Sequence, residues 1–401
     1  MSDGLVTPAG AETASCAPTS RCRLFVVQPS PFCNIDCDYC YLPDRSNKVR
    51  MDEATLRRAF ERLFQSGIAR EQVSVIWHAG EPLAVPIAWY ERAWEIIESL
   101  RPKDLRVDES FQTNATLIDD RWCEYFRRRG SGVGVSVDGP AMLNDAHRRT
   151  RSGRGTFDRV VKGIETLRRH GIDFHAISVL TWDALEFPDE LYEFYLSMGI
   201  RRVGFNVEEK EGEHTSSTLD REGIVERYRR FLDRFLVRVA REPGRLEVRE
   251  LEEARGLLLS PPPDGTCLVN DQADPFVIVS VAADGSFTTF SPEFLGLSGE
   301  PYGSFTLGNV HRDAFEEVRA TPRFARLVDD IRAGISACKE SCAYYAWCGG
   351  GAPANKFFEN GSLRSSETLY CRLTRKTVID VVLAHLEGAA LPAVGPRAAT
   401  A

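Results

Sequence analysis

The chain of 401 residues lacks several features that define whole classes of protein. No stretch approaches the ~18 consecutive apolar residues of a membrane-spanning helix. The first twenty residues have neither a basic start nor an apolar core, so they do not resemble a secretory signal. Lys and Arg total 50 against 58 Asp and Glu, and the net charge of −8 gives none of the basic surplus typical of nucleic-acid binding. We expect a cytoplasmic protein that binds neither nucleic acid nor membrane.

Disordered and collagen-like chains are excluded as well, because 43% of the residues are hydrophobic and 27% are charged. What stands out is the distribution of the eleven cysteines. Disulfides do not persist in a reducing cytoplasm, and an odd number of cysteines argues against a closed disulfide framework. Seven of them form two groups near the two ends of the chain, which indicates metal binding or catalysis. The groups are Cys33, Cys37 and Cys40, and then Cys338, Cys342, Cys348 and Cys371.

Stretches with strand-like and helix-like patterns alternate six times before residue 242. The predicted strands are 23–28, 72–77, 105–114, 133–138, 174–180 and 202–207, and the predicted helices are 52–67, 89–100, 119–129, 156–170, 189–198 and 220–241. This alternation predicts a parallel sheet with crossover helices, either open or closed into a barrel. Ligands of such sheets bind at the carboxyl ends of the strands, and the polar motifs of this sequence follow those ends.

The first cysteine group, in the segment FCNIDCDYCY, places three thiols in a CxxxCxxC loop directly after the first predicted strand. Three thiolates on a [4Fe–4S] cluster leave one iron open for a substrate or cofactor, since such a cluster normally takes four. The alternative is a zinc knuckle, but a structural zinc site needs four ligands, and no fourth Cys or His lies within ten residues.

This loop resembles the signature of the radical S-adenosylmethionine (SAM) enzymes, and further motifs of that family follow in order. HAGEP (78–82) resembles its Gly-Gly-Glu-Pro motif, with alanine in place of the first glycine, and QTN (112–114), SVDGP (136–140) and NDAHR (144–148) end later strands. The resemblance covers about residues 23–240 and implies a partial (β/α)6 barrel. It also implies SAM contacts: Tyr39 near the adenine, Ala79, Gly80 and Glu81 at the amino group, Asn114 as a further contact, Ser136 at the ribose and Arg148 at the carboxylate.

The second cysteine group resembles the SPASM extension of radical SAM enzymes, which commonly holds two auxiliary [4Fe–4S] clusters. Its four cysteines match the ligands of the second auxiliary cluster, and the spacing between the first two is one residue longer than usual. For the first auxiliary cluster Cys267 is a possible ligand, but two expected thiolates fall on Phe290 and Ala352. We therefore expect one auxiliary cluster and two clusters in total. A four-cysteine zinc ribbon is the alternative.

The resulting fold prediction is an α/β chain with a partial (β/α)6 radical SAM barrel and a small C-terminal Cys-rich SPASM-type domain. The predicted segments are a mobile tail (1–21), the barrel (22–242), a linker with a bridging helix (243–264), a SPASM-like domain (265–387) and a disordered tail (388–401). The boundary rests on the Pro-rich break SPPPDG (260–265), after which a hairpin over 276–290 is predicted around Asp284-Gly285.

SPASM extensions are typical of enzymes that modify peptides or proteins. The phrases PSPFCNIDCDYCYLPDR, WHAGEPL and TFSPEFLG are similar to a branch that crosslinks ribosomally made precursor peptides, joining a β-carbon to an aromatic ring as a cyclophane. An external electron donor is implied as a partner. Glu293 in TFSPEFLG is the candidate base or substrate contact. The alternatives are a peptide epimerase, a thioether-forming enzyme, a sulfatase-type maturase and a zinc-stabilised binding protein without catalysis.

Overall fold

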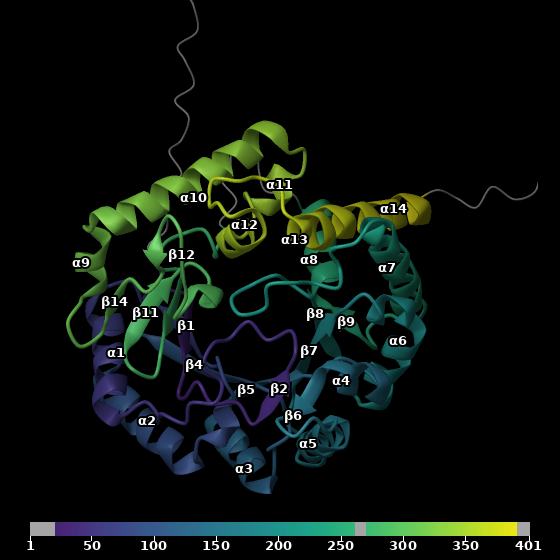
Figure 1. Cartoon of the computed structure of the whole chain (residues 1–401). Coiled ribbons are helices and arrows are strands. Elements are labelled where there is room, and N and C mark those ends of the chain that lie inside the picture. The colour runs from purple at the N-terminus through teal and green to yellow at the C-terminus, as the bar shows by residue number, and fades with distance from the viewer. Residues whose placement is uncertain (1–20, 261–269, 391–401) are drawn as a thin grey trace, which may run out of the picture.

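A computed structural model describes residues 21–260 and 270–390 (Figure 1). Its main feature is a ten-stranded sheet with strand order β14-β11-β10-β1-β3-β4-β5-β7-β8-β9. The strands are β1 (Leu24–Val27), β3 (Gln72–Trp77), β4 (Arg106–Thr113), β5 (Gly132–Ser136), β7 (His175–Leu180), β8 (Arg202–Val207), β9 (Glu247–Val248), β10 (Ile278–Val281), β11 (Ser286–Thr289) and β14 (Gly308–Asn309). All neighbours from β10 through β1 to β9 pair in parallel, so their carboxyl ends meet at one edge.

Helices cover the outer side of this curved sheet, as Figure 1 shows for the purple to teal half of the chain. They are α1 (Glu53–Gln65), α2 (Ile87–Leu100), α3 (Asp120–Arg129), α4 (Ala141–His147), α5 (Phe157–Arg169), α6 (Pro188–Ser197), α7 (Ile224–Arg241) and α8 (Arg249–Leu259). Local sequence fixes their ends. The Asp52 side chain accepts a hydrogen bond from the Thr55 amide at the start of α1, and Gly130 ends α3 with φ 67°. The six predicted strand–helix pairs and the α/β fold class are confirmed.

The C-terminal part contributes to the same sheet. β10 and β11 form the predicted hairpin, and β10 also pairs in parallel with β1, with Val279 opposite Phe25. Both side chains are fully buried, so one hydrophobic core runs from the N-terminal strands into this hairpin. The division into a barrel over 22–242 and a SPASM-like domain over 265–387 stays a prediction. The predicted tails and the Pro-rich break lie largely outside the described residues.

The remaining C-terminal elements are helical and cross the top of Figure 1, between the two edges of the sheet. They are α9 (Phe315–Arg319), α10 (Pro322–Ser341), α11 (Tyr345–Cys348), α12 (Pro353–Asn360), α13 (Leu369–Cys371), a π-helix (Arg372–Thr377) and α14 (Val378–Ala390). Two small ribbons complete the fold: β12 (Ser298–Gly299) pairs with β13 (Gly303–Ser304), and β2 (Ile35–Cys37) pairs with β6 (Arg148–Thr150). Within the described ranges, no helix is both long and apolar enough to cross a membrane.

Candidate active site

The carboxyl ends of β1, β3, β4, β5 and β8 surround one cavity, which we call the central cavity. The predicted N-terminal site residues that line it are Cys33, Cys37, Tyr39, Cys40, Gly80, Glu81, Asn114, Ser136 and Arg148, and Glu293 joins them from the C-terminal part. Ala79 lies beside this wall, is buried, and does not line the cavity. The topology thus brings together residues that are up to about 260 positions apart in the sequence, because neighbouring parallel strands end at one edge.

The three thiols of the first group come from the loop after β1. Cys37 lies on β2, directly opposite Arg148 of β6, so the small ribbon fixes the loop against the strand that follows α4. The Arg151 guanidinium donates to the Cys33 carbonyl at 2.9 Å. Burial raises the pKa of both the Cys33 and Cys37 thiols to about 12, so they need a bound cationic centre to ionise at neutral pH.

Glu81 connects this loop with the ends of β3 and β4. Its amide donates to the Phe32 carbonyl at 2.8 Å, and its carboxyl accepts from the Thr113 hydroxyl at 2.7 Å and the Asn114 amide at 2.8 Å. A third donor is the Leu83 amide at 2.9 Å. Burial raises the pKa of Glu81 to about 7 despite these hydrogen bonds. The side chain therefore holds the loop in position.

Gly80 has φ 135°, and a Cβ there would meet the Ser30 carbonyl oxygen at 2.4 Å. The close approach of the two loops therefore requires glycine. Ala79 has φ 65°, a left-handed conformation that is costly for an L-residue with a Cβ. The Ala79 carbonyl accepts from the Gln28 side chain at 2.8 Å, which holds that conformation in place. The alanine in the motif is thus accommodated with backbone strain.

A buried ion pair supports the opposite wall of the central cavity. The Arg148 guanidinium contacts both carboxyl oxygens of Asp138 at 3.0 Å, and both side chains are at most 7% exposed. Asp138 also accepts from the Val179 amide at 2.9 Å and from the Tyr39 hydroxyl. The Arg148 guanidinium lies 5.5 Å from the centre of the Tyr39 ring. Tyr39 and Arg148, the predicted adenine and carboxylate contacts, therefore form one charged unit with Asp138. The sequence motifs gave Asp138 no role.

Two groups on the wall of the central cavity remain available to a ligand. Ser136 accepts a hydrogen bond from Gln112 at 2.8 Å and keeps its own hydroxyl hydrogen to donate. The Asn114 side chain, in contrast, donates to Asn34 at 2.9 Å and accepts from Thr116, and its amide nitrogen lies 3.8 Å from the Cys33 sulfur. His78 has a pKa lowered to about 4 by burial, and its Nδ1 atom has no hydrogen-bond partner within the described residues. The residues present fit an iron–sulfur cluster with a bound polar cofactor. The three thiols would hold the cluster, while the unpaired His78 nitrogen and the backbone at Gly80 would contact the cofactor.

Three carboxyl groups line the central cavity together with the thiols. Glu209 and Glu211, which we call the acid pair, share a hydrogen bond, and the Asn355 amide donates to them at 2.5 and 3.1 Å. Glu293 accepts from the Ser291 hydroxyl. Burial raises the pKa of Glu209, of Glu211 and of Glu293, and the neighbouring Glu209 charge raises that of Glu211 further. The run of acids after β8 is thus built into the cavity wall.

The four C-terminal cysteines line a second cavity, which we call the cysteine cavity. It lies between the end of α10, α11 and α13, with Cys338 and Cys342 at one helix end and Cys371 at another. Within residues 21–260 and 270–390 no three His, Cys, Asp or Glu side chains are arranged to hold a single metal ion. In each group the thiols instead share the wall of one cavity, and a cubane cluster takes its thiolates on separate irons.

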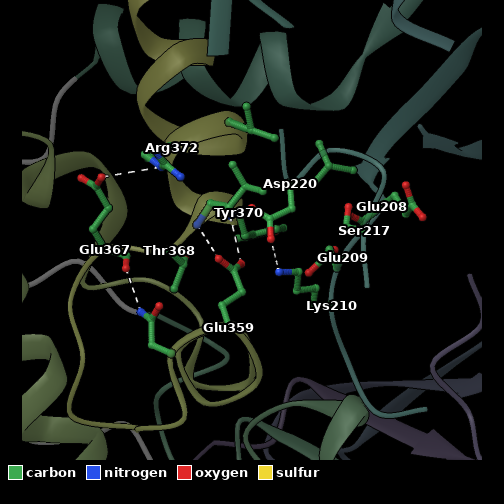
Figure 2. A pocket seen from close by; sticks show the side chains of 14 residues that line it. Glu208, Glu209, Lys210, Ser217, Asp220, Glu359, Glu367, Thr368, Tyr370 and Arg372 are labelled. Carbon is green, nitrogen blue, oxygen red and sulfur yellow. Dashed lines mark hydrogen bonds and ion pairs between the residues drawn. The ribbon is translucent and has the colours of Figure 1, made fainter. Parts of the chain in front are cut away.

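A third, acidic cavity lies between these two (Figure 2). It shares Glu208 and Glu209 with the central cavity, and Glu367 and Thr368 with the cysteine cavity. Figure 2 shows Tyr370 and Glu359 between these two pairs of residues, with the Tyr370 amide donating to Glu359 at 3.1 Å. The three cavities are therefore contiguous along their walls.

The four remaining cysteines are partly placed by the structure. Cys22 and Cys123 lie in the core, whereas Cys16 and Cys267 are outside the described residues. Phe290, at the position of one missing ligand, is buried and stacks on Phe324 at 6.2 Å. Sequence reasoning missed Asp138, His78, Asn355 and Lys356 as site residues. The first two stand inside motifs that were recognised, while the last two lie between Cys348 and Cys371 without any motif of their own.

Comparisons with known proteins agree with this geometry. The sequence profile of the Radical SAM superfamily matches residues 27–183. An uncharacterised protein of Synechocystis sp. is 41% identical over 369 residues, which is 91% of this chain and 92% of that protein. The serine-type anaerobic sulfatase-maturating enzyme of Bacteroides thetaiotaomicron is 30% identical over 223 residues, and this match spans 52% of the chain and 53% of that enzyme, about half of each.

Solved structures share the fold along most of the chain. Native anSMEcpe with bound AdoMet superposes with a TM-score of 0.74 at 21% identity, covering 91% of this chain and 98% of that one. SuiB of Streptococcus suis, bound to its precursor peptide SuiA, gives a TM-score of 0.62 at 17% identity, covering 88% and 76%. The chain contains a radical SAM domain over residues 27–183 and is an S-adenosylmethionine-dependent radical enzyme, with sulfatase-maturating enzymes among its relatives.

Proposed function

We propose that this enzyme is a radical SAM/SPASM maturase that forms a cyclophane-type crosslink in a ribosomally made precursor peptide. The observation that carries the proposal is the central cavity, which Glu293 of the C-terminal part lines together with the three thiols of the first group. The four cysteines of the second group line a cavity that shares lining residues with the acidic cavity, which in turn shares lining residues with the central cavity. This arrangement supports hydrogen abstraction in the central cavity and transfer of a second electron toward the cysteine cavity.

In this proposal Cys33, Cys37 and Cys40 hold the radical SAM cluster. When bound, the cluster and SAM supply a 5′-deoxyadenosyl radical, which takes a hydrogen atom from an unactivated carbon. The protein's own residues place the cofactor: Ser136 donates to a ribose hydroxyl, the backbone at Gly80 receives the amino group with Ala79 buried behind it, and Asn114 adds a contact. Arg148 places its positive charge near the carboxylate of SAM, and Asp138 holds the Arg148 guanidinium in one orientation.

The proposed crosslinking step removes two hydrogens from the peptide and forms one carbon–carbon bond. The β-carbon of one peptide residue loses a hydrogen atom to the deoxyadenosyl radical, and the resulting carbon radical forms a carbon–carbon bond to a nearby aromatic ring. The ring would lose a proton to the Glu293 carboxylate and one electron to an acceptor. Cys338, Cys342, Cys348 and Cys371 would hold an auxiliary [4Fe–4S] cluster, which would supply that electron acceptor. An external donor supplies the electron that each round of SAM cleavage consumes. Glu293 suits the role of base, because burial raises its pKa toward that of a proton acceptor at neutral pH.

The peptide partner is proposed to enter along the acidic cavity of Figure 2. Its lining contains Glu208, Glu209, Asp220, Glu359 and Glu367, against Lys210 and Arg372, and both of these cations pair with acids of the same lining. Surplus acid at the approach to a catalytic cavity favours a peptide with basic residues near the modified segment.

The test is the intact mass of a candidate precursor, encoded by a short reading frame beside this gene and co-expressed under low oxygen. Crosslinking removes the mass of two hydrogens per ring formed. With aromatic rings fully deuterated, the loss becomes one hydrogen and one deuterium. An unchanged mass with deuterium uptake from heavy water would indicate an epimerase and contradict the proposal.

The sulfatase-maturase function is the second candidate, because the partial match to the serine-type enzyme favours it. Oxidation of a seryl side chain to an aldehyde also removes two hydrogens, so mass alone does not separate the two. The aldehyde reacts with hydroxylamine probes and keeps all ring deuterium, whereas the cyclophane does neither. Glu293→Gln should leave deoxyadenosine formation measurable while suppressing the crosslinked product.

A further inference from the structure

Lys356 on α12 is a buried cation beside the cysteine cavity. Its residue is 3% exposed, and its Nζ atom donates to the Gly334 carbonyl at 2.8 Å and to the Cys338 sulfur at 3.4 Å. Within the part of the chain that the structure describes, the ammonium forms no ion pair with a carboxylate. A lysine in such a place costs stability unless an anion offsets its charge.

The surroundings of Lys356 are shaped to admit it. A Cβ at Gly334 of α10 would lie 3.1 Å from Nζ and 2.2 Å from the Leu363 carbonyl oxygen, so only glycine fits between the helix and the ammonium. At Gly351 a Cβ would stand 3.7 Å from Cε of the lysine. Both glycines border the cysteine cavity or contact its lining, so the structure brings the cation to the thiols and away from water.

Asn355, the residue before Lys356, contacts the central cavity instead of the cysteine cavity. Asn355 donates to both members of the acid pair in the central cavity, while Lys356 donates to Cys338. Two consecutive residues of α12 therefore fix the cysteine cavity relative to the central cavity. This short connection suits a group that accepts an electron from chemistry in the central cavity.

We propose that Lys356 is a positioning residue that raises the reduction potential of the auxiliary [4Fe–4S] cluster. This inference rests on the cluster assigned under the proposed function. A cubane with four thiolates becomes more negative by one charge when it accepts an electron. A buried ammonium that donates to a ligand sulfur stabilises that reduced state more than the oxidised one. The cluster then becomes a better acceptor for the electron released by the crosslinking step.

The experiment compares reduction potentials in full-length, anaerobically reconstituted protein, measured by redox titration with electron paramagnetic resonance. SAM addition identifies the signal of the first cluster, which serves as an internal reference. Lys356→Met should lower the midpoint of the second cluster by at least about 59 mV, a tenfold change in its one-electron equilibrium. Lys356→Arg, which keeps the charge, should stay near the wild-type value. If the Met variant loses the second cluster, Lys356→Gln replaces it, since it keeps a donor without the charge.

The matched control is Lys339→Met, which removes the same charge one residue from Cys338 at an exposed position. It should move the midpoint far less, because water screens that charge. An unchanged midpoint in the uncharged Lys356 variant, with roughly eight irons per chain retained, would overturn the role of Lys356. Wild-type protein with only about four irons would instead overturn the auxiliary cluster itself.

Discussion

Replacing Asp138 by asparagine tests the charged unit in the wall of the central cavity. The change keeps the shape of the side chain and removes the charge that faces Arg148, whose guanidinium is buried and contacts both carboxyl oxygens at 3.0 Å. Removing one partner of a buried ion pair typically costs about 3–5 kcal/mol, since the remaining charge stays buried without compensation. Asparagine can still accept from the Val179 amide, so we expect a loss of about 3 kcal/mol, at the lower end of that range.

The assay is urea unfolding of the apoprotein under reducing conditions, combined with SAM binding to the reconstituted enzyme. Arg148→Met and the double variant complete a thermodynamic cycle, which should return a coupling energy between Asp138 and Arg148 of at least ~1 kcal/mol. The matched control is Asp120→Asn, which removes a surface carboxylate that pairs with Arg169 and His170 and should cost far less, because water screens exposed charges. If Asp138→Asn costs no more than this control and SAM affinity is unchanged, the buried pair does not support the site.

Three further outcomes are expected. Ala79→Gly should stabilise the apoprotein by up to ~1 kcal/mol in urea unfolding, because glycine relieves the strain of the left-handed backbone conformation. Gly80→Ala should destabilise the apoprotein, because the added Cβ has no room. Equal effects of the two variants would refute the strain argument. The acid pair has pKa values raised above those of the unfolded chain, so its contribution to stability is present below about pH 4.3 and is lost as pH rises through the folded values. Glu211→Gln should therefore unfold at higher urea than wild type at alkaline pH, and this advantage should shrink toward about pH 5; a pH-independent difference would contradict the burial of the pair. Cys37→Ala should abolish deoxyadenosine formation, whereas Cys342→Ala should keep some SAM cleavage and lose the peptide product, and an intact product would remove the second group from the reaction.

The sequence predicted the elements of the site that depend on local pattern. The loops after β1, β3, β4 and β5 were located because buried strands and amphipathic helices have distinct periods, and parallel strands end at one edge. The cysteines of both groups were found from spacing alone, and the structure places each group around one cavity.

Features that depend on tertiary burial were not predictable in this way. The acids after β8 resemble a solvated loop in sequence, and only the packing of α12 against them buries Glu211 beside Asn355. In sequence, Lys356 does not differ from an exposed lysine of a helix, and only the packing of α10 against α12 buries it. The pairing of β10 with β1 joins residues about 250 positions apart, and no local signal specifies such a partner.

The most direct test of the central claim is the fate of a β-hydrogen of the precursor peptide. The peptide would carry deuterium on the β-carbon of the residue that becomes crosslinked, and the 5′-deoxyadenosine formed would be analysed by mass spectrometry. Deoxyadenosine should gain one deuterium for each ring formed, and the crosslinked peptide should lack it. Unlabelled deoxyadenosine, together with a modified peptide that retains all of its β-deuterium, would refute hydrogen abstraction at the β-carbon.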